Sequence, residues 1–466
     1  MADRGGKAPA WTSAAAIVDV DAEVVIVGAG IAGLATALAL RRLGMGAAGG
    51  GVLVLERHAE LRSTGAALTI FPNGWFALRA LGVAHKLTSR YDAFGTCVSV
   101  AGSDFCDSSL CVIIALSSAM SAACRSRVTT LETGATQVFR FAGRKSSSGD
   151  VRVRPMHRKA LLEALAEELP PGTIRFSSKL ASIATEKAQG LTEIAVLRLD
   201  DGTVIRSKVL IGCDGVHSVV SQWLGLSEPA SSGRSAVRGL AVYPDGHGLK
   251  KELRQFLSEG LRAGMVPISD TDVYWFLVNN TVPAEQEAGT DPAKILREVT
   301  DNLGRHMPAE YLDVVRHSDS GNLSWAPLLY RAPWAILRGP AARGAVTVAG
   351  DAFHPMTPDM AQGGCSALED AVVLARALSR AATPADGVAT YVVERRVRAA
   401  WLVAAAYLSG WVQQGGTNIQ GVRGYMVRLF RDWIFYRFLF PRLADTMWFD
   451  CGDLMEPTVE GKTHSE

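Results

Sequence analysis

The sequence predicts an α/β fold with three parts: a Rossmann-like dinucleotide-binding domain, a second domain built on a mixed β-sheet, and a C-terminal helical region. Three observations predict it. A glycine cluster at residues 28–33 lies between a β-branched run and an Ala/Leu-rich segment. Residues 226–330 contain alternating aliphatic and aromatic stretches, typical of a sheet, and the chain beyond residue 386 has a largely helical pattern.

Length, charge and cysteine content narrow the class of protein. A chain of 466 residues is long enough for two or three structural units. A net charge of +2 gives no reason to expect a nucleic-acid partner. The seven cysteines form no Cys-x-x-Cys pair and no zinc-site spacing, so we expect a reducing compartment and no metal. Residues 1–21 lack the pattern of a signal or transit peptide, and no apolar run is long enough to span a bilayer. We therefore expect a disordered tail on a cytoplasmic enzyme.

The first βαβ unit begins directly after this tail. Residues 23–27 are β-branched without alternation, which is typical of a buried parallel strand. An Ala/Leu-rich helix is expected over 34–43, ending at Gly44. A second apolar strand follows at 52–55 and leads into the pair Glu56-Arg57. The order strand, helix, strand and acid is that of a dinucleotide-binding unit.

The glycine cluster explains how such a unit binds a dinucleotide. Gly28 permits the tight turn, Gly30 lets the backbone approach a pyrophosphate, and Gly33 lets the helix pack closely on the strand. The phosphates then lie at the helix N-terminus, where free N–H groups favour anions. Glu56, 23 residues beyond Gly33, stands where a ribose-binding acid is expected, and we include Arg57 beside it in the site. The alternative is a tight turn without a ligand.

Further strands lead into polar motifs in the same way. A strand at 209–211 runs into Gly212-Cys213-Asp214-Gly215, and another at 345–349 runs into Gly350-Asp351. These and the first unit predict a composite dinucleotide-binding domain over 22–225 and 331–385, a substrate-side sheet domain over 226–330, and C-terminal helices over 386–466. Smaller elements are also expected: helices at 156–169, 291–303 and 366–378, and a hairpin at 197–205 with an Asp-Gly turn.

Taken together, three motifs carry a family resemblance. After the glycine cluster come Asp214-Gly215 with its flanks and then the run from Gly350 to Gly364. In this order they resemble the single-component FAD-dependent aromatic hydroxylases, the family of para-hydroxybenzoate and salicylate hydroxylases, whose plant members look closest. The resemblance extends from residue 23 to about 378, apart from 97–124, and it implies a Rossmann-like FAD-binding domain.

The resemblance assigns further cofactor-binding residues. In the family, the Asp matching Asp214 helps to hold both FAD and the nicotinamide cofactor; an ordinary Asp-Gly turn is the alternative. Asp351 is expected to bind the ribityl hydroxyls, since carboxylates make the stronger kind of hydrogen bond. Gly363 and Gly364 are expected to place backbone N–H groups beside flavin N1 and O2. Arg158 matches a family arginine that contacts FAD, although it also suits the surface of an amphipathic helix.

Two positions depart from the family pattern. Family members often have Arg where this chain has Ser221, which would weaken contact with the nicotinamide cofactor. They usually have Gly where this chain has Ala361. A side chain at a left-handed backbone position costs roughly 1 kcal/mol, so the substitution would lower the affinity for flavin.

The resemblance also implies a reaction. FAD, reduced by NADH or NADPH, would react with O2 to form a flavin C4a-hydroperoxide that hydroxylates a small aromatic or similarly activated substrate. No second GxGxxG follows a strand, so no separate nicotinamide domain is expected. Trp275 or Phe276 is a candidate pocket wall, with sheet core as the alternative; no catalytic acid or base is assigned. Two other functions stay open: an FAD oxidase or reductase without oxygen transfer, and a non-catalytic flavin-binding protein.

Two stretches stand apart. Residues 97–124 are rich in Ser, Ala and Cys and have no match in the family pattern, which indicates an insertion. Residues 425–449 mix aromatics with Arg428, Arg431, Arg437 and Arg442. Such a segment suits an amphipathic helix on an anionic membrane, but packing on the body of the enzyme is the favoured interpretation. The oligomeric state is left open.

Overall fold

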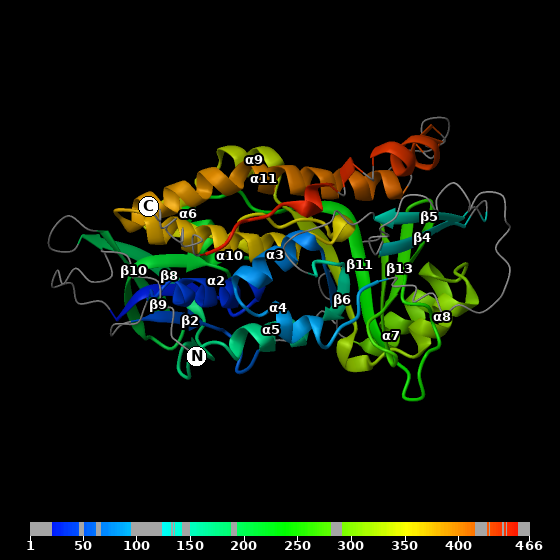
Figure 1. The fold of residues 1–466 in the computed structure, drawn as a ribbon, viewed down its shortest axis with the longest axis horizontal. Helices are drawn as coiled ribbons and strands as arrows, with labels where there is room; N and C mark the ends of the chain where they lie inside the picture. The colour runs from blue at the N-terminus through cyan, green and yellow to red at the C-terminus, as the bar shows by residue number, and fades with distance from the viewer. Residues whose placement is uncertain are drawn as a thin grey trace, which may run out of the picture.

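The computed structural model has an elongated shape with a β-sheet toward each end (Figure 1). Long helices run along one side and join the two halves (Figure 1). The structure describes residues 21–45, 51–61, 67–94, 124–131, 134, 136–141, 150–187, 193–280, 291–414, 426–427, 429–439, 442–443 and 445–454. All but the last residue of the predicted N-terminal tail at 1–21, and all but the last residue of the expected insertion at 97–124, lie outside these residues.

The first sheet contains the predicted βαβ unit. β1 (Ala22–Val27) lies between two parallel neighbours, β2 (Val52–Leu55) and β10 (Val204–Gly212). This confirms the buried parallel strand, because all six residues of β1 are buried. The predicted hairpin is also confirmed, since β9 (Glu193–Leu199) pairs antiparallel with β10. The other strands of this sheet are β7 (Ile174–Arg175), β8 (Leu180–Lys187), β16 (Ala342–Arg343) and β17 (Val346–Val348).

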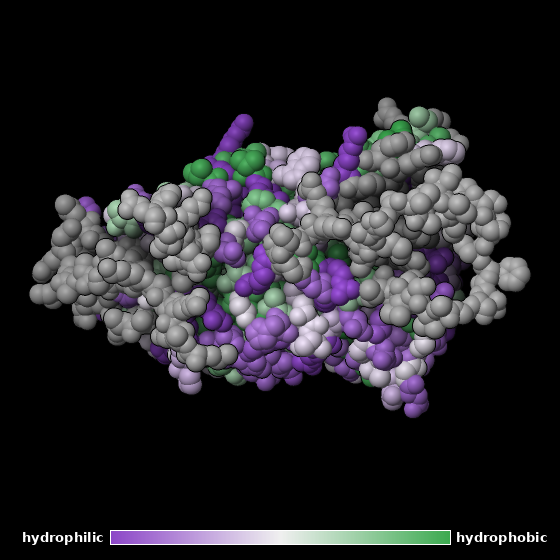
Figure 2. Space-filling model, in the orientation of Figure 1, coloured by the Kyte–Doolittle hydropathy of each residue, from purple (hydrophilic) through white to green (hydrophobic). Residues whose placement is uncertain are grey.

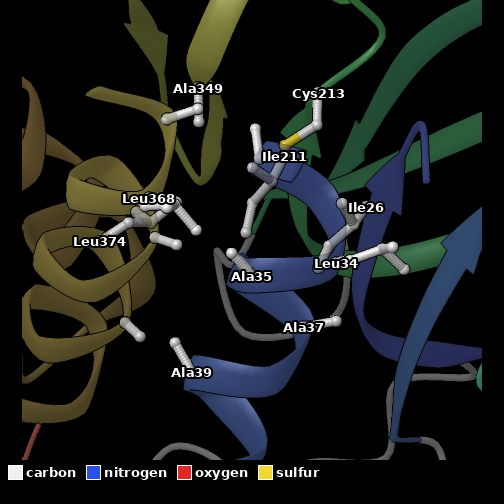
Figure 3. Close-up of a cluster of buried hydrophobic side chains, with 14 of the residues drawn as sticks. Ile26, Leu34, Ala35, Ala37, Ala39, Ile211, Cys213, Ala349, Leu368 and Leu374 are labelled. Atoms are coloured by element: carbon white, nitrogen blue, oxygen red, sulfur yellow. The ribbon is translucent and has the colours of Figure 1, made fainter. Parts of the chain in front are cut away.

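Two helices follow the glycine-containing motifs. α2 (Ile31–Arg42) begins after Gly30, and α10 (Gly363–Arg380) includes the helix expected at 366–378. In the core, α2 lies between the strands and α10: Ile26 and Ile211 of the sheet are on one side, and Leu368 and Leu374 are on the other (Figure 3). The three glycine motifs are therefore held by one hydrophobic core.

The second sheet has seven strands in the order β15-β11-β14-β13-β12-β4-β5. Its members between 226 and 330 follow the expectation for a sheet domain: β11 (Ala230–Val242), β12 (Leu253–Ser258), β13 (Leu261–Pro267), β14 (Asp272–Asn279) and β15 (Ser324–Tyr330). The other two strands correct the predicted boundary. β4 (Cys124–Thr130) and β5 (Thr136–Phe141), assigned from sequence to the first domain, extend this sheet because β4 pairs in parallel with β12.

The helix expected at 156–169 begins two residues later than its pattern indicates. Residues 154–157 form β6 (Arg154–His157), which pairs with β3 (Ala67–Ile70), and α5 (Arg158–Ala166) follows. The helical insertion of the second domain is confirmed as α7 (Pro292–Arg297), with Asp291 accepting from the Ala293 N–H at its start, and the π-turn η1 (Glu298–Leu303).

The C-terminal region is helical as expected, through α11 (Pro384–Gln413) and the π-helical η5 (Arg431–Leu439). None of the described helices combines the length and the apolar character needed to cross a membrane. The remaining helices and turns are α3 (Pro72–Ala80), α4 (Ala84–Thr88), α6 (Val219–Leu224), α8 (Ala309–Arg316), η2 (Ser320–Asn322), α9 (Pro333–Arg338), η3 (Gly350–Ala352), η4 (Pro358–Met360) and η6 (Asp445–Trp448).

Candidate functional site

The three predicted glycines have three different surroundings. Gly28 has φ +103°, and a Cβ there would lie 2.4 Å from the carbonyl oxygen of Cys213, so the first glycine loop lies against the Asp-Gly motif. A Cβ on Gly33 would lie 1.9 Å from the Gly28 oxygen, which explains the close approach of α2 to β1. A Cβ on Gly30 would meet nothing within 4 Å. Only Gly30 therefore faces open space that a phosphate group could fill.

Glu56 holds this glycine loop in place through hydrogen bonds to its backbone. Its buried carboxylate accepts hydrogen bonds from the backbone N–H groups of Ala29 and His58, both at 2.9 Å. Arg57 points to the surface, where its Nε donates to Nε2 of His58 at 3.1 Å. The carboxylate thus lies beside the dinucleotide loop, as the sequence predicts for a ribose-binding acid.

Several helices have no side-chain cap at their N-terminus, and α2 and α10, which begin at the glycine motifs, are among them. Neither α2, whose N-cap is Gly30, nor α10, whose N-cap is Gln362, receives a side-chain hydrogen bond at its start. The first N–H groups of a helix need partners and carry partial positive charge. These two ends are therefore suited to bind negatively charged or polar ligand atoms.

Asp351 lies beside the start of α10. A Cβ on Gly363 would be 3.9 Å from its Oδ1. The side chain is open to solvent, yet the protein around it raises the pKa of the carboxyl, and the charges of His354, Arg158 and Arg238 oppose that rise. Among the described residues no hydrogen bond or ion pair reaches this carboxylate. It is an acceptor available to a ligand.

Arg158 comes to the same place from the first residue of α5, half-buried and close enough to influence Asp351. The structure therefore brings together two residues that are 193 positions apart in the sequence. The sequence analysis predicts both for the same cofactor, on family resemblance alone.

Asp214 has a structural role at the start of α6. Its Oδ2 accepts from the N–H of Val219 at 2.7 Å, and Ser218 Oγ accepts from the N–H of Ser221 at 2.9 Å, so both side chains fix the start of α6. Burial raises the pKa of the Asp214 carboxyl. The Asp-Gly turn is thus held rigidly against the glycine loop at Gly28.

A buried arginine that the sequence analysis missed lies beside Ser221. Arg331 Nη2 donates to Ser221 Oγ at 2.9 Å, and its Nη1 donates to the carbonyl oxygens of Ala352 and Phe353 at 2.6 and 2.7 Å. Ser221 Oγ itself donates to the Ala352 oxygen at 2.8 Å. Burial lowers the pKa of Arg331 to about 10. A guanidinium therefore stands beside position 221 after all, supplied by the residue that follows β15.

Ala361 adopts the left-handed conformation that the sequence analysis considered. Its φ is +52°, and it ends the short turn η4 with its N–H donating to the Pro358 oxygen at 3.0 Å. The strain of an L side chain in this conformation is roughly 1 kcal/mol. The surrounding loop holds this geometry despite the methyl group.

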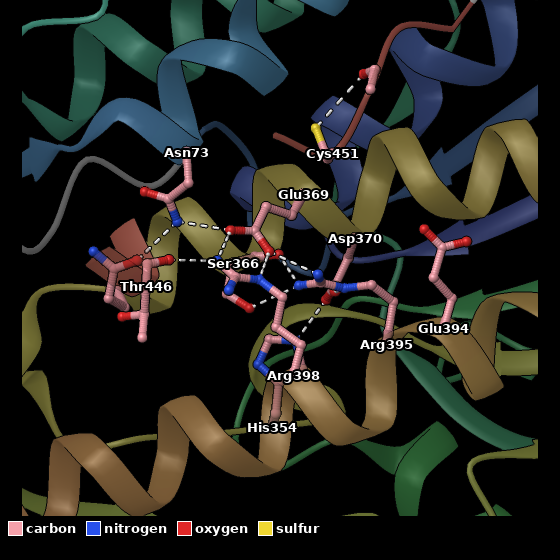
Figure 4. A network of polar contacts seen from close by, with 12 residues as sticks. Asn73, His354, Ser366, Glu369, Asp370, Glu394, Arg395, Arg398, Thr446 and Cys451 are labelled. Atoms are coloured by element: carbon pink, nitrogen blue, oxygen red, sulfur yellow. Dashed lines mark hydrogen bonds and ion pairs between the residues drawn. The ribbon is translucent and has the colours of Figure 1, made fainter. Parts of the chain in front are cut away.

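The polar cluster shown in Figure 4 holds the start of that loop. His354 Nε2 lies 2.6 Å from Asp370 Oδ2, and Arg395 donates to Asp370 and Glu369, both at 2.6 Å. Arg398 adds a two-point contact with Glu369. Burial acts to raise the pKa of Asp370, but the charges of His354 and Arg395 outweigh it and lower that pKa to about 2. The cluster ties the third motif to α10 and α11.

A second buried ion cluster holds the other end of the loop. Arg234 of β11 donates to both carboxylate oxygens of Asp359, at 3.1 and 2.8 Å, and Arg262 of β13 donates to Oδ1 at 2.9 Å. Arg234 also donates to Gln414 Oε1 at 3.0 Å. The third motif is thereby fixed to the second sheet as well. Neither cluster has a signal in the sequence, because its members come from elements that are far apart along the chain.

The two candidate pocket walls lie on opposite faces of β14. Trp275 is fully buried, its Nε1 donates to Ser318 Oγ at 2.7 Å, and it packs edge-on against Tyr311, so it belongs to the core under α8. The sheet-core alternative, which the sequence analysis also gave, therefore holds for Trp275, and Trp275 is not a pocket wall. Phe276 is half-buried on the other face, which it shares with Tyr274. Arg238 of β11 lies on the same face, directly opposite Phe276 in the antiparallel pair. Among the described residues no hydrogen bond or ion pair engages the Arg238 guanidinium.

Comparison with known proteins decides the family. A family model described as "FAD binding domain" matches residues 21–406. The chain belongs to this FAD-binding family. Among curated members, it is 36% identical over 451 residues to "Monooxygenase 2" of Arabidopsis thaliana, covering 93% of this chain and 98% of that protein. It is 30% identical over 401 residues to "Aurachin C monooxygenase/isomerase" of Stigmatella aurantiaca, covering 84% of this chain and 89% of that one.

A solved structure shares the fold. The structure of Klebsiella pneumoniae HpxO complexed with FAD and uric acid superposes with a TM-score of 0.71 at 22% identity, covering 91% of this chain and 96% of that one. The predicted α/β fold and family resemblance are confirmed. With its family and its relatives, the chain is an FAD-dependent monooxygenase by class.

Proposed function

We propose that this monooxygenase uses NADH or NADPH and O2 to hydroxylate a small aromatic or similarly activated molecule. The observation that carries the proposal is the arrangement around Asp351. A carboxylate without a partner among the described residues lies beside the uncapped start of α10 and near Arg158. Such a set of acceptor, N–H donors and cation suits the polyol and ring edge of a flavin.

The chain offers a matching set of groups for the rest of FAD. We propose that the pyrophosphate lies against Gly30 at the start of α2, where a ligand meets no side chain. Glu56 and Arg57 are the proposed contacts of the adenosine side, and Gly28 and Gly33 keep the loop and helix in place. When bound, FAD supplies the capacity to accept hydride and to activate oxygen.

The groups near the ring edge have separate proposed tasks. Asp351 accepts from the ribityl hydroxyls, and the N–H groups of Gly363 and Gly364 favour negative charge on the ring edge beside them. Asp214 orients the Asp-Gly turn, and Arg331 contributes the positive charge that Ser221 lacks. These assignments support tight cofactor binding despite the two departures from the family pattern.

We propose that the substrate lies against the face of the second sheet formed by Tyr274, Phe276 and Arg238. The aromatic rings supply a flat apolar surface and limit the access of water. Arg238 is a cation without a hydrogen-bond or ion-pair partner among the described residues, so a negatively charged or strongly polar substituent of the substrate would satisfy it. The charge of Arg238 acts on the Asp351 carboxyl and opposes the rise in its pKa, which supports a position of Arg238 near the proposed flavin site.

The described cysteines agree with the cytoplasmic location that we propose. Cys213, Cys365 and Cys451 are buried free thiols. Free thiols persist in reducing compartments, although buried ones are also sheltered from oxidants elsewhere.

The test begins with the absorbance spectrum of the purified protein, followed by oxidation of NADH and NADPH with candidate phenols and aromatic acids under ¹⁸O₂. We expect flavin bands, substrate-stimulated consumption of the nicotinamide cofactor, and one ¹⁸O atom in the product. Consumption without labelled product would indicate an oxidase or reductase. Flavin bands without consumption would indicate a non-catalytic flavin-binding protein.

Arg238→Gln separates substrate binding from cofactor binding in this assay. We expect the flavin spectrum to be unchanged, the KM for an anionic substrate to rise at least tenfold, and a larger share of the electrons to leave as hydrogen peroxide. Arg238→Lys is the matched control. It keeps the charge but not the planar donor set, so its KM should rise less than that of Arg238→Gln. An unchanged KM in both variants would remove Arg238 from the substrate site.

A further inference from the structure

A short segment crosses from the first half of the molecule to the second sheet. It follows α4 and consists of residues 91–94, which we call the strap; in Figure 1 it is part of the blue chain that leaves α4. Hydrophilic side chains cover the surface over α4 and α5, where the strap begins (Figure 2). Tyr91, Ala93 and Phe94 are buried, whereas Asp92 is exposed. The strap therefore turns three side chains inward and one charge toward solvent.

The buried side of the strap borders the proposed substrate face. Phe94 forms a small apolar cluster with Val153 and Val266, and Tyr274 packs against this cluster. Val266 is also the direct neighbour of Tyr274 in the antiparallel pairing of β13 with β14. Phe94 thus covers the sheet beside a ring that we propose as part of the substrate site.

Tyr91 joins the strap to the start of β14. Its hydroxyl lies 3.0 Å from Nδ1 of His157, whose Nε2 is 3.7 Å from Asp272 Oδ2. Asp272 and Tyr274 are two residues apart on β14, so they share one face of the sheet. His157 directly precedes Arg158, the proposed flavin contact. The strap therefore touches both the substrate face and the segment that carries this arginine.

The outer ties of the strap are ion pairs that are open to solvent. Lys251, between β11 and β12, has its Nζ 2.7 Å from Asp92 Oδ2 and 3.4 Å from Asp270 Oδ1. The side chains of Lys251, Asp92 and Asp270 are 42%, 75% and 88% exposed. Exposed ion pairs contribute little to stability, and salt weakens them. The strap is therefore held only weakly to the second half of the molecule.

The other end of the proposed substrate face is held by buried ion pairs. Arg262 lies over the Phe276 ring, with its Cζ 5.2 Å from the ring centroid. The same guanidinium donates to the buried Asp359, which also pairs with Arg234. Breaking a buried ion pair leaves an uncompensated charge in the interior and costs far more than breaking an exposed one. The face is therefore opened at a lower cost at the strap than at Phe276.

We propose that the strap is the gate through which the substrate enters, and that the ion pair between Asp92 and Lys251 keeps this gate closed. In the open state Asp92 leaves Lys251, and Phe94 no longer covers the sheet beside Tyr274. The burial of Phe94 and Tyr91 keeps the closed state dominant, because opening exposes both rings to water. The proposal rests on the proposed substrate face, but its test needs only the bound FAD.

The test compares the FAD-loaded parent with Asp92→Asn by two measurements. Hydrogen exchange of the Phe94 amide, followed by mass spectrometry, reports opening, because this N–H donates to the Val153 oxygen at 3.1 Å. Quenching of the flavin fluorescence by acrylamide, a small neutral solute, reports access to the flavin. We expect Asp92→Asn to raise the exchange rate and the quenching constant about two- to fivefold, as for the loss of one exposed ion pair. In the parent, both should rise with salt.

Two further variants control for other causes. Asp200→Asn removes an exposed ion pair of the same kind, with Lys179 at 2.8 Å, on the hairpin of the first sheet, and it should change neither measurement. Lys251→Gln should resemble Asp92→Asn. The double variant Asp92→Asn/Lys251→Gln should add little to either, because both changes remove the same contact.

Three results would overturn the proposal. Unchanged exchange at Phe94 in Asp92→Asn would show that the ion pair does not hold the strap. Faster exchange with unchanged quenching would show that the strap opens without giving access to the flavin. An equal effect of Asp200→Asn would assign the change to a general loss of stability. None of these results bears on the proposed reaction, which the assay with labelled oxygen tests separately.

Discussion

Single residues in the first glycine loop divide structural from ligand-binding roles. Gly33 is required by a backbone oxygen 1.9 Å from where its Cβ would be, whereas Gly30 has open space and an extended backbone, with φ −79° and ψ −172°. Any L residue adopts the Gly30 conformation without strain. The same motif therefore contains one glycine that the fold needs and one that the proposed cofactor needs.

Substitution with alanine separates these two roles. Gly33→Ala should lower the free energy of unfolding by about 1–3 kcal/mol or more, because the backbone must move to admit the methyl group. Gly30→Ala should leave the stability of the apoprotein nearly unchanged but weaken FAD binding at least tenfold. Thermal unfolding and flavin fluorescence titration measure the two effects. Equal loss of stability in both variants would contradict the assignment of Gly30 to the pyrophosphate.

For single residues, the sequence predicts the site residues that belong to local motifs. It misses the residues that reach the site through contacts between distant parts of the chain. The positions of Gly28 and Glu56 follow from strand ends and motif order, which are local. Asp351 follows from the family resemblance. Arg331 lies 110 residues beyond Ser221, and nothing near either residue indicates that they meet. Their contact depends on how β15 approaches η3, which only the folded chain determines.

Among the elements, α11 contacts the greatest variety of partners. It lies against α9 and α10, and its end reaches the second sheet, where Gln414 Nε2 donates to the oxygens of Gly260 and Val278 at 3.2 Å each. Gly410 makes this approach possible. A Cβ there would lie 2.2 Å from Asp359 Oδ2 and 2.3 Å from Arg234 Nη1.

Gly410→Ala should therefore lower the free energy of unfolding, although Gly→Ala inside a helix usually raises it. In a helix interior this change normally stabilises by roughly 1 kcal/mol. Here we expect a loss of several kcal/mol, because the methyl group disrupts a buried ion pair. Urea unfolding measures the difference. Ser409→Ala is the neighbouring control: its buried hydroxyl has no hydrogen-bond partner among the described residues, so the change should be neutral or stabilising. A stabilised Gly410→Ala would refute the close contact.

Elements with a strong period were predictable, and short elements near motifs were not. The Ala/Leu-rich composition of α2 and the alternation in β14 are direct signals. β6 was missed because Arg154–His157 has no apolar alternation of its own and becomes a strand only through pairing with β3. Likewise, the membership of β4 in the second sheet depends on a partner, β12, that is more than 100 residues away.

For the whole molecule, the buried carboxylates set the response to acid. The pKa of Asp370 is about 2 in the folded protein, below its ordinary value of 3.8. A depressed pKa contributes stability above the ordinary value, and that contribution is lost as pH falls through the folded value. The buried Asp359 also has a lowered pKa, because Arg234 and Arg262 outweigh the effect of burial. Asp214 and Asp351 have raised pKa values. They therefore lower the stability of the folded protein at higher pH, and this cost disappears as pH falls.

We therefore expect the free energy of unfolding to fall steeply between about pH 4 and pH 2. Urea unfolding at a series of pH values measures it. Asp370→Asn should be less stable at pH 7 and should show a shallower slope below pH 4, since it removes one of the groups that titrate. A slope that is unchanged in this variant would assign the acid response to other carboxylates.

The loop from Gly350 to Gly364 is clamped at both ends, and this has a mechanical consequence. One end is joined to α10 and α11 through His354 and Asp370, and the other is joined to the second sheet through Asp359. Parting the two halves of the molecule would pull a carboxylate from two buried guanidinium groups, at a cost of several kcal/mol. We therefore expect the two halves to move as one rigid body, and the proposed substrate to reach the proposed flavin site without a hinge opening between the two sheets.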